Sequence, residues 1–232
     1  MPRSSNFWKL SPSGLYGFEE CPACFWLEHH CGKPPGIPFV LNAALDNVFK
    51  ARFDSYRARG EMPPELESLQ REGVSLYPKL VNLNQWRNSA RSLEVCNERV
   101  GYILSGKIDD LLMEPDGRLI PIDFKVSGYA PKEEKQKYYI LQLHAYALML
   151  REQGFNISDR AYLIYYFIRD LLNPSLSVEF ESQLDRVDLD LQAFEQTLMR
   201  MVELLEGPYP GDNPDCPTCQ YHGARMRFST GT

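Results

Sequence analysis

The sequence predicts an α/β protein in which helices flank a mixed β-sheet, with an additional helical section at the N-terminal end. Apolar residues recur at helical spacing over 39–59 and 133–153. The pattern is strand-like between about 93 and 126, and a further β-prone run lies at 161–169. The chain has 232 residues, of which 44% are hydrophobic, so we expect one domain with a substantial core.

The first section, over about 1–92, is predicted to be mainly helical. Ser11 is a suitable N-cap, and Pro12 suits the first position of a helix. The Gly- and Pro-rich stretch 32–38 predicts a loop. Three further helical segments are expected at 39–59, 64–72 and 80–90.

The second section, over about 93–185, is predicted to be the core of the domain. Its expected elements are strands up to residue 126, a helix over 133–153, a buried central strand at 161–169 and a further strand near 175–180. The third section, over about 186–232, begins with a helix at 189–205 and ends in a tail that contains two cysteines.

Composition and charge exclude some classes of protein. No run of 18 or more uncharged apolar residues is present, so no membrane-spanning helix is expected. The first residues do not lead into the apolar segment of a signal peptide, and we therefore expect a cytoplasmic protein. The net charge of −6 argues against a protein that coats nucleic acid by bulk electrostatics, although it does not exclude a local basic channel.

A predicted β-hairpin carries the candidate catalytic residues. Glu114–Gly117 fits a type I turn with a following bulge, which closes an antiparallel hairpin. Counting outward from this turn pairs Asp109 with either Ile122 or Asp123, depending on the bulge. Asp123 and Lys125 are two residues apart and share one face of their strand.

Buried charges in such a hairpin require compensation. Two adjacent carboxylates repel each other, and a divalent cation removes this conflict. Asp109 and Asp123 are therefore candidate ligands of Mg²⁺ or Mn²⁺, and Lys125 is placed to orient the attacking water and to stabilise phosphate charge. The alternative is an ordinary Asp–Lys ion pair on an edge strand, with Asp109 in solvent. Asp110 is expected to point to the opposite face in a structural role.

The helix over 133–153 adds a second candidate group. Gln142 and Tyr146 lie four residues apart and hence on one helix face, although an ordinary polar face gives the same pattern. Lys132, Lys135 and Lys137 come just before them and could contact a phosphate backbone or simply face solvent.

These motifs, in this order, resemble the PD-(D/E)XK nuclease superfamily, and specifically its RecB-like branch of CRISPR- and recombination-associated exonucleases. The matching residues are Gly106–Asp109, Asp123–Lys125 and Gln142–Tyr146. The segment Leu10–Ser13, followed by Cys21, also resembles the entry helix of that branch.

The resemblance implies a restriction-endonuclease-like core and hydrolysis of phosphodiester bonds in DNA, with the metal ligands Asp109 and Asp123, the catalytic residue Lys125, and Gln142 and Tyr146 as supporting catalytic residues. Exonuclease-like action in DNA repair, recombination or CRISPR adaptation is the implied role. The implied partners are DNA that is single-stranded or has free ends, and a larger recombination or CRISPR complex. The alternative is a non-catalytic module on a degenerate nuclease fold that binds nucleic acid or protein.

One departure from the branch lies in the helix over 39–59, where Lys50 occupies the place of a metal-binding histidine. A charged lysine cannot be a metal ligand, so a weaker, differently metallated or inactive site stays open. His144 lies between Gln142 and Tyr146 and does not restore the pattern. Two glutamates of the preceding strand are further candidate ligands, Glu94 and Glu98.

Two CxxC pairs lie near opposite ends of the chain, and four thiolates can complete a zinc site or hold an iron–sulphur cluster. Such a centre would staple the N-terminal helices to the C-terminal tail. Some RecB-like nucleases hold a 4Fe-4S cluster with one N-terminal and three C-terminal cysteines, so the resemblance favours 4Fe-4S here, with Zn²⁺ as the alternative. Cys31 and Cys96 are expected to be ordinary buried or half-buried thiols. The predicted centre consists of Cys21, Cys24, Cys216 and Cys219.

Overall fold

A computed structural model describes residues 7–33, 40–88, 90, 92–131, 137–169 and 177–230. Its main sheet has five strands in the order β2-β5-β6-β7-β8. β6 and β7 are parallel and the other pairs are antiparallel, so the predicted mixed sheet is confirmed. The strands are β2 (Ser75–Leu76), β5 (Asp110–Met113), β6 (Leu119–Ser127), β7 (Arg160–Ile168) and β8 (Phe180–Asp188).

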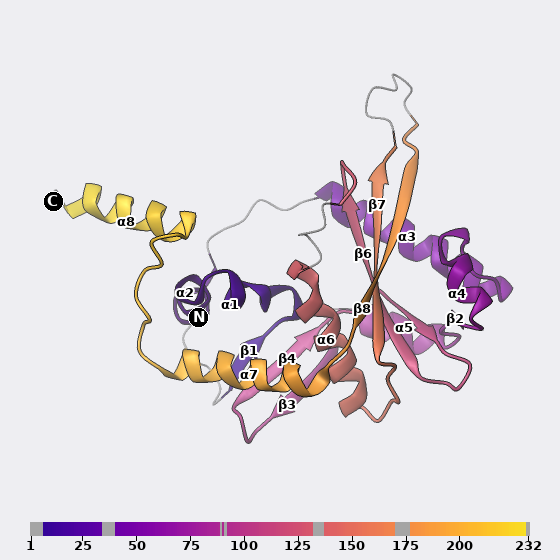
Figure 1. Ribbon diagram of the computed structural model, residues 1–232, viewed down its shortest axis with the longest axis horizontal. Helices are drawn as coiled ribbons and strands as arrows, with labels where there is room; N and C mark the ends of the chain where they lie inside the picture. The colour runs from indigo at the N-terminus through magenta and orange to yellow at the C-terminus, as the bar shows by residue number, and fades with distance from the viewer. Residues whose placement is uncertain are drawn as a thin grey trace.

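Helices cover both faces of this sheet (Figure 1). On β6, Ile120, Ile122 and Phe124 point to the face covered by α3 (Val40–Arg59) and α4 (Glu67–Arg71). Side chains alternate along a strand, so Asp123 and Lys125 point to the opposite face. That face is covered by α6 (Lys137–Glu152), and this arrangement brings polar residues of α6 to those of β6.

A second, three-stranded sheet has the order β1-β4-β3. It consists of β1 (Trp8–Leu10), β4 (Tyr102–Gly106) and β3 (Leu93–Asn97). α6 packs against β3 and β4 as well as against β6 and β7, which explains why the residues from Leu141 to Leu150 are all buried. A helix surrounded by protein is apolar on nearly every side.

The remaining helices lie around these sheets. α7 (Leu191–Glu206) packs on α6 and α2, and α8 (Pro217–Thr230) lies beside α2, away from the main sheet (Figure 1). The other helical elements are η1 (Pro12–Gly14), α1 (Tyr16–Glu20), α2 (Pro22–Cys31), η2 (Pro64–Leu66) and α5 (Leu80–Arg87). Within the described ranges, no helix is long and apolar enough to cross a lipid bilayer.

Most predicted elements are present, with specific differences. Of the strand expected near 175–180, residues 175 and 176 lie outside the described part, residues 177–179 are not strand, and β8 begins at Phe180 and continues to Asp188. Residues 34–38 of the expected loop and 133–136 of the expected helix also lie outside it. The predicted helix start at Pro12 is a 3₁₀ turn, and β1 before it was not predicted.

The hairpin between β5 and β6 decides where the candidate residues meet. The Gly117 amide donates to the Glu114 carbonyl at 2.9 Å, and Gly117 has φ +87°, so the predicted turn is present. Asp110 pairs with Ile122 in the antiparallel register, which places Asp109 opposite Asp123. The second of the two predicted registers is therefore the observed one.

Candidate active site and cysteine centre

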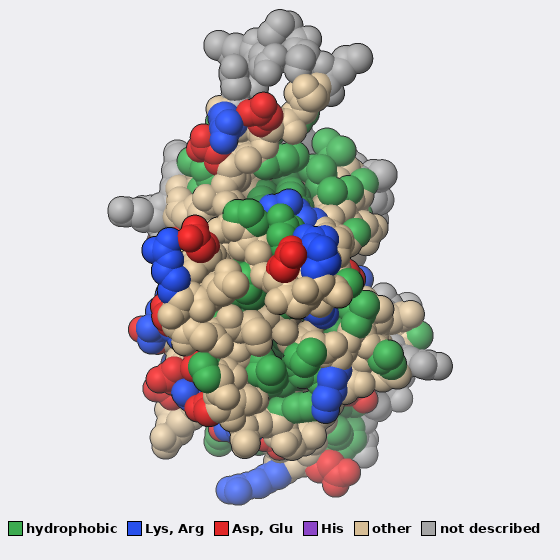
Figure 2. Space-filling model, turned by 90° about the vertical axis from the view of Figure 1, so that its right-hand side faces the viewer, with side chains coloured by type: hydrophobic (Ala, Val, Ile, Leu, Met, Phe, Trp, Pro, Cys, Tyr) green, Lys and Arg blue, Asp and Glu red, His purple; other side chains and the backbone are tan. Residues whose placement is uncertain are grey.

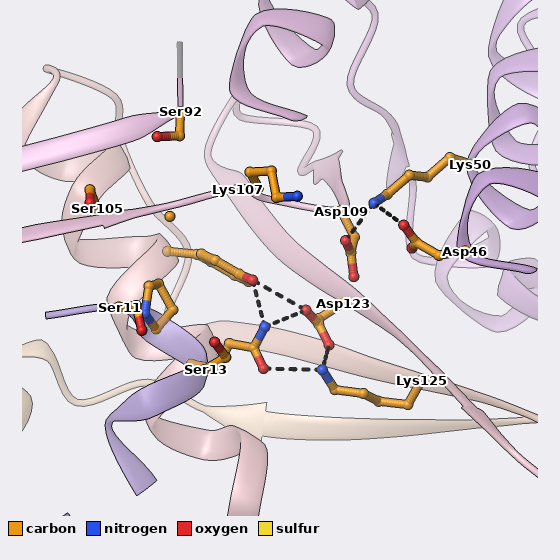
Figure 3. A pocket seen from close by; sticks show the side chains of 14 residues that line it. Ser11, Ser13, Asp46, Lys50, Ser92, Ser105, Lys107, Asp109, Asp123 and Lys125 are labelled. Atoms are coloured by element: carbon orange, nitrogen blue, oxygen red, sulfur yellow. Dashed lines mark hydrogen bonds and ion pairs between the residues drawn. The ribbon is translucent and has the colours of Figure 1, made fainter. Parts of the chain in front are cut away.

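A cavity of about 440 Å³ lies between β6, α6, α3 and the end of β4, and the five predicted site residues line it (Figure 3). Asp109 directly precedes β5, and β6 contains Asp123 and Lys125. The other two residues, Gln142 and Tyr146, lie on α6. The fold therefore brings together residues that are up to 37 positions apart in the sequence, from 109 to 146. Their catalytic roles remain predictions.

Asp123 is the most deeply buried charged group of the cavity, with 1% of its surface exposed. Its Oδ1 atom accepts a hydrogen bond from Gln142 Nε2 at 2.9 Å and a long one from the Tyr146 hydroxyl at 3.4 Å. Its Oδ2 atom lies 2.5 Å from Lys125 Nζ but accepts no hydrogen bond of regular geometry from a described residue. Burial raises the pKa of Asp123 to about 7, although Lys125 opposes this shift.

Lys125 is held from three sides. Its ammonium group pairs with Asp123, donates to Gln142 Oε1 at 3.0 Å and lies 4.1 Å from the centre of the Tyr139 ring. Burial alone would lower the pKa of Lys125, but Asp123 and Asp109 outweigh burial and raise it. Lys125 is therefore a fixed positive charge at neutral pH.

Asp109 lies next to Asp123 but has different partners. Its Oδ2 atom accepts the backbone N–H of Phe124 at 2.9 Å, and its Oδ1 atom lies 2.8 Å from Lys50 Nζ. Lys50 also binds Asp46, at 2.6 Å. Burial would raise the pKa of Asp109, but Lys50 and the Phe124 amide lower it. The residue that replaces the expected histidine thus places an ammonium group directly on a candidate metal ligand.

The residues of the cavity fit a divalent cation. Two carboxylates from adjacent strands lie in it, one with a buried oxygen that lacks a regular donor, and Mg²⁺ prefers one or two carboxylates together with water and phosphate oxygens. Burial and the neighbouring Asp109 raise the pKa of Asp123, so further positive charge nearby would favour its ionised form. A cation beside Asp109 and Asp123 would supply that charge.

Sequence reasoning missed a buried ion-pair network behind Asp109. Arg87 donates from Nε to the Asp109 carbonyl oxygen at 2.7 Å and also pairs with Asp54 and Asp110, both at 2.8 Å. Arg57 pairs with the same two aspartates. Asp110 is fully buried, so the prediction that it points away from the cavity in a structural role agrees with these contacts. Asp54 and Arg57 lie three residues apart on α3, but no spacing in the sequence links this pair to Arg87 on α5 or to Asp110 on β5.

The remaining candidates do not line the cavity. Glu94 and Glu98 are exposed, and β3, which contains Glu94, belongs to the second sheet. His144 binds the Ile140 carbonyl and accepts the Asp190 amide, so it joins α6 to α7. Lys137 is exposed at the start of α6. The other two lysines of the predicted basic face, Lys132 and Lys135, lie outside the described residues.

The four cysteines of the two CxxC pairs form a separate cluster where α2 meets α8. The sulfur atoms of Cys21 and Cys219, of Cys24 and Cys216, and of Cys24 and Cys219 lie 3.7, 3.7 and 3.6 Å apart. All four lie within 4.8 Å of one another, which is too far for disulfides and suits a shared metal centre. Burial and the neighbouring thiols raise the pKa of Cys24, so a cation is needed to keep it as a thiolate.

The other two cysteines were predicted incorrectly. Cys31 and Cys96 are exposed free thiols rather than buried or half-buried ones. Cys31 is the last residue of α2, and Cys96 lies on a strand at the end of the three-stranded sheet. Neither belongs to the four-cysteine cluster, so the centre involves only the two CxxC pairs among the described cysteines.

Comparison with models of protein families matches residues 38–224 to the PD-(D/E)XK nuclease superfamily. A search of curated proteins finds no match. Among solved structures, one described as "Crystal structure of SSO0001" aligns with a TM-score of 0.42 and 15% sequence identity, over 96% of this chain and 87% of that one.

Proposed function

The chain belongs to the PD-(D/E)XK nuclease superfamily, and from this premise we propose that it is a metal-dependent nuclease that hydrolyses phosphodiester bonds in DNA. The observation that carries the proposal is the buried Asp123 Oδ2 atom, which lies beside Lys125 and lacks a regular hydrogen-bond donor. Among the described residues this oxygen pairs only with Lys125, and it lies in a cavity that also contains Asp109, so a bound cation could be its second partner.

Each residue of the cavity has a proposed part in the reaction. Asp109 and Asp123 would hold Mg²⁺ or Mn²⁺, which when bound lowers the pKa of a coordinated water and polarises the phosphate. Lys125 keeps its proton, so it stabilises negative charge on the phosphate and orients the attacking water rather than removing a proton from it. Gln142 contacts both Asp123 and Lys125 and keeps them in place. Tyr146 supports Asp123 from the same helix face.

The finer substrate assignment follows the motifs. Gly106–Asp109, Asp123–Lys125 and Gln142–Tyr146 resemble the RecB-like branch, which supports exonuclease-like action on DNA that is single-stranded or has free ends. Action within a recombination or CRISPR complex belongs to the same proposal. Figure 2 shows interspersed acidic and basic side chains on the face that α3 and α4 cover. A substrate would therefore be attracted locally at the cavity rather than by this face as a whole.

A second candidate function is a non-catalytic module on the same fold, and the Lys50–Asp109 ion pair favours it. If Lys50 replaces the metal, wild-type protein binds no Mn²⁺, and Lys50→Met exposes a pair of carboxylates that does. If the site is catalytic, wild-type protein already binds Mn²⁺, and Lys50→Met tightens the binding by removing a competing cation. Isothermal titration of both proteins, with Lys79→Met as a surface control, separates these outcomes.

For the four cysteines we propose Zn²⁺ rather than the 4Fe-4S cluster that the resemblance favours. Sulfur atoms around one tetrahedral zinc lie about 3.8 Å apart, given Zn–S bonds of about 2.3 Å. The separations of 3.6 and 3.7 Å agree with this value. A 4Fe-4S cluster binds each cysteine to a different iron and so holds the sulfurs farther apart. Metal analysis should give one zinc in a colourless protein, whereas a brown protein that contains iron would restore the cluster.

A digestion assay tests the nuclease proposal. Wild-type protein with Mn²⁺ should degrade single- or double-stranded DNA, and EDTA should stop the reaction. Lys125→Ala should reduce the rate by roughly 10²–10³-fold, as loss of a transition-state donor does. Lys79→Ala, which removes an exposed lysine outside the cavity, should leave the rate unchanged. Equal rates in the two variants would show that the cleavage has another source.

A further inference from the structure

One end of the cavity is lined by hydrogen-bond donors that the proposed reaction does not use. Ser92 and Ser105 lie at this end with Ser11 and Ser13 across from them, and the Lys107 side chain lies between these serines and Asp109 (Figure 3). We refer to these five residues as the donor cluster. Their side chains form no hydrogen bond or ion pair with a described residue. The charged groups at the other end are all paired, since Lys50 binds Asp46 and Asp109 and Lys125 binds Asp123.

The fold builds the donor cluster around Gly106. Ser105 and Lys107 flank this glycine in the chain, and the register of β3 pairs Leu93 with Gly106, which brings Ser92 beside Lys107. Pro12 packs directly on Gly106, so that a Cβ atom there would lie 2.6 Å from the proline ring. The segment around Pro12 thus meets the two strands of a local hairpin, β3 and β4, at one point.

The strand β1 sets the position of the last two serines. It runs parallel to β4 and pairs Leu10 with Leu104, so the chain continues through Ser11 and Ser13 alongside Ser105. The close contact between Pro12 and Gly106 fixes this segment against the cavity wall. The packed backbone around Gly106 therefore fixes the positions of the five residues, with Ser92 and Ser105 half-buried and Ser11, Ser13 and Lys107 exposed.

We propose that the donor cluster binds a second, non-reacting phosphate of the nucleic-acid strand whose scissile phosphate lies at Asp109 and Asp123. Four hydroxyl groups and one ammonium group suit a ligand rich in acceptor oxygens and negative charge, and phosphate contacts of this kind fix the register of a strand. Lys107 and Asp109 are two residues apart, at most about 7 Å between Cα atoms, so the ligand is a phosphate close to the reacting one. This inference rests on the proposed nuclease function.

The test measures binding in EDTA, so that cleavage plays no part. The probes are fluorescent single-stranded DNA and RNA oligonucleotides of about 12 nucleotides. Lys107→Met should weaken binding at low salt roughly tenfold, as expected for the loss of a charged hydrogen bond. The slope of log K against log salt concentration should fall by about 0.7, the value for one phosphate contact on a single strand. Ser105→Ala should weaken binding less.

A set of probes with one neutral methylphosphonate linkage locates the contact. For the wild type, neutralising one particular linkage should weaken binding, and for Lys107→Met the same linkage should have no effect. Lys79→Met and Ser75→Ala are the exposed controls, and both should bind as the wild type does. The proposal is overturned if Lys107→Met matches Lys79→Met, if every linkage behaves alike in both proteins, or if the wild type binds neither probe.

Cleavage of the same probes in Mn²⁺ separates this inference from the nuclease proposal. If the wild type cleaves and Lys107→Met binds as tightly as the wild type, the donor cluster does not bind a phosphate, while the nuclease assignment stands. The other outcome is that one methylphosphonate linkage weakens binding of the wild type but not of Lys107→Met, and the wild type does not cleave. In that case the phosphate site stands and the nuclease assignment fails.

Discussion

At Asp123 a carboxyl group is buried beside a lysine and opposite a second carboxyl group. Burial raises its pKa from the ordinary value of 3.8 to about 7. Between these two pH values the carboxyl group is mostly protonated in the folded, metal-free protein and mostly ionised in the unfolded chain. Stability contributed by this group is therefore highest at low pH and decreases as pH rises from 3.8 towards 7.

Asp123→Asn should remove this pH dependence. In EDTA, the free energy of unfolding of the variant relative to that of wild type should rise by on the order of a few kcal/mol as pH increases from about 4 to about 7, whatever constant cost the lost pairing with Lys125 adds. Urea unfolding at a series of pH values measures the difference. Asp188→Asn, at a highly exposed site, should follow the wild-type curve. A constant difference between Asp123→Asn and wild type over this range would contradict the raised pKa.

At this scale the sequence predicted that Asp109 and Asp123 lie on neighbouring strands of one hairpin, but it did not predict the arginines behind them. Asp109 and Asp123 are equally far from the turn of the hairpin, so the two strands bring them together. Asp123 and Lys125 are two residues apart on β6, so they share one face of the strand. Arg57 and Arg87 come from two separate helices, and only the folded chain shows that they meet at Asp110. Tertiary ion pairs of this kind have no local pattern.

At the scale of elements, α3 and α5 are joined to the hairpin by the buried ion-pair network. Arg87→Met should leave Asp110 with one cation fewer and release the Asp109 carbonyl. Breaking a buried pair costs about 3–5 kcal/mol, so the free energy of unfolding should fall by that amount. Mn²⁺ affinity should also fall, because the Asp109 backbone loses its support.

Arg71→Met is the matched control, because Arg71 forms an exposed pair with Glu67. Its effect on unfolding in urea should stay within about 1 kcal/mol. Similar losses for Arg87→Met and Arg71→Met would mean that the network does not support the hairpin.

Long helices were more predictable than short strands. The apolar repeat over 39–59 corresponds to α3, which spans Val40–Arg59. β1 and β2 have only three and two residues, which is too few to show alternation. They exist because neighbouring strands pair with them, and β1 is the element that brings Ser11 and Ser13 to the cavity.

At the scale of the whole molecule, the four-cysteine centre joins the two ends of the chain. The cysteine pattern predicted this connection, since two CxxC pairs need each other to complete a tetrahedral site. The division of the strands into two sheets was not predictable, because it depends on how α6 packs between them. Figure 1 shows α8 lying beside α2 and away from the main sheet.

Cys216→Ser should release the metal and loosen α2 and α8 together, although Cys24 and Cys216 are 192 residues apart. Hydrogen exchange of α2 amides should become faster, and metal analysis should show the loss. Cys31→Ser changes an exposed thiol at the end of the same helix and should alter neither. Unchanged exchange in α2 after metal loss would mean that the centre does not staple the ends.

The most direct test of the central claim, that Asp109 and Asp123 form one cation site, is a Mn²⁺ titration followed by electron paramagnetic resonance. Wild-type protein should bind Mn²⁺, and Asp109→Asn and Asp123→Asn should each weaken binding by more than roughly 100-fold, because losing a ligand costs more than losing an outer-shell partner. Asp188→Asn should bind like the wild type. Equal binding by all four proteins, or none by the wild type, would contradict the claim.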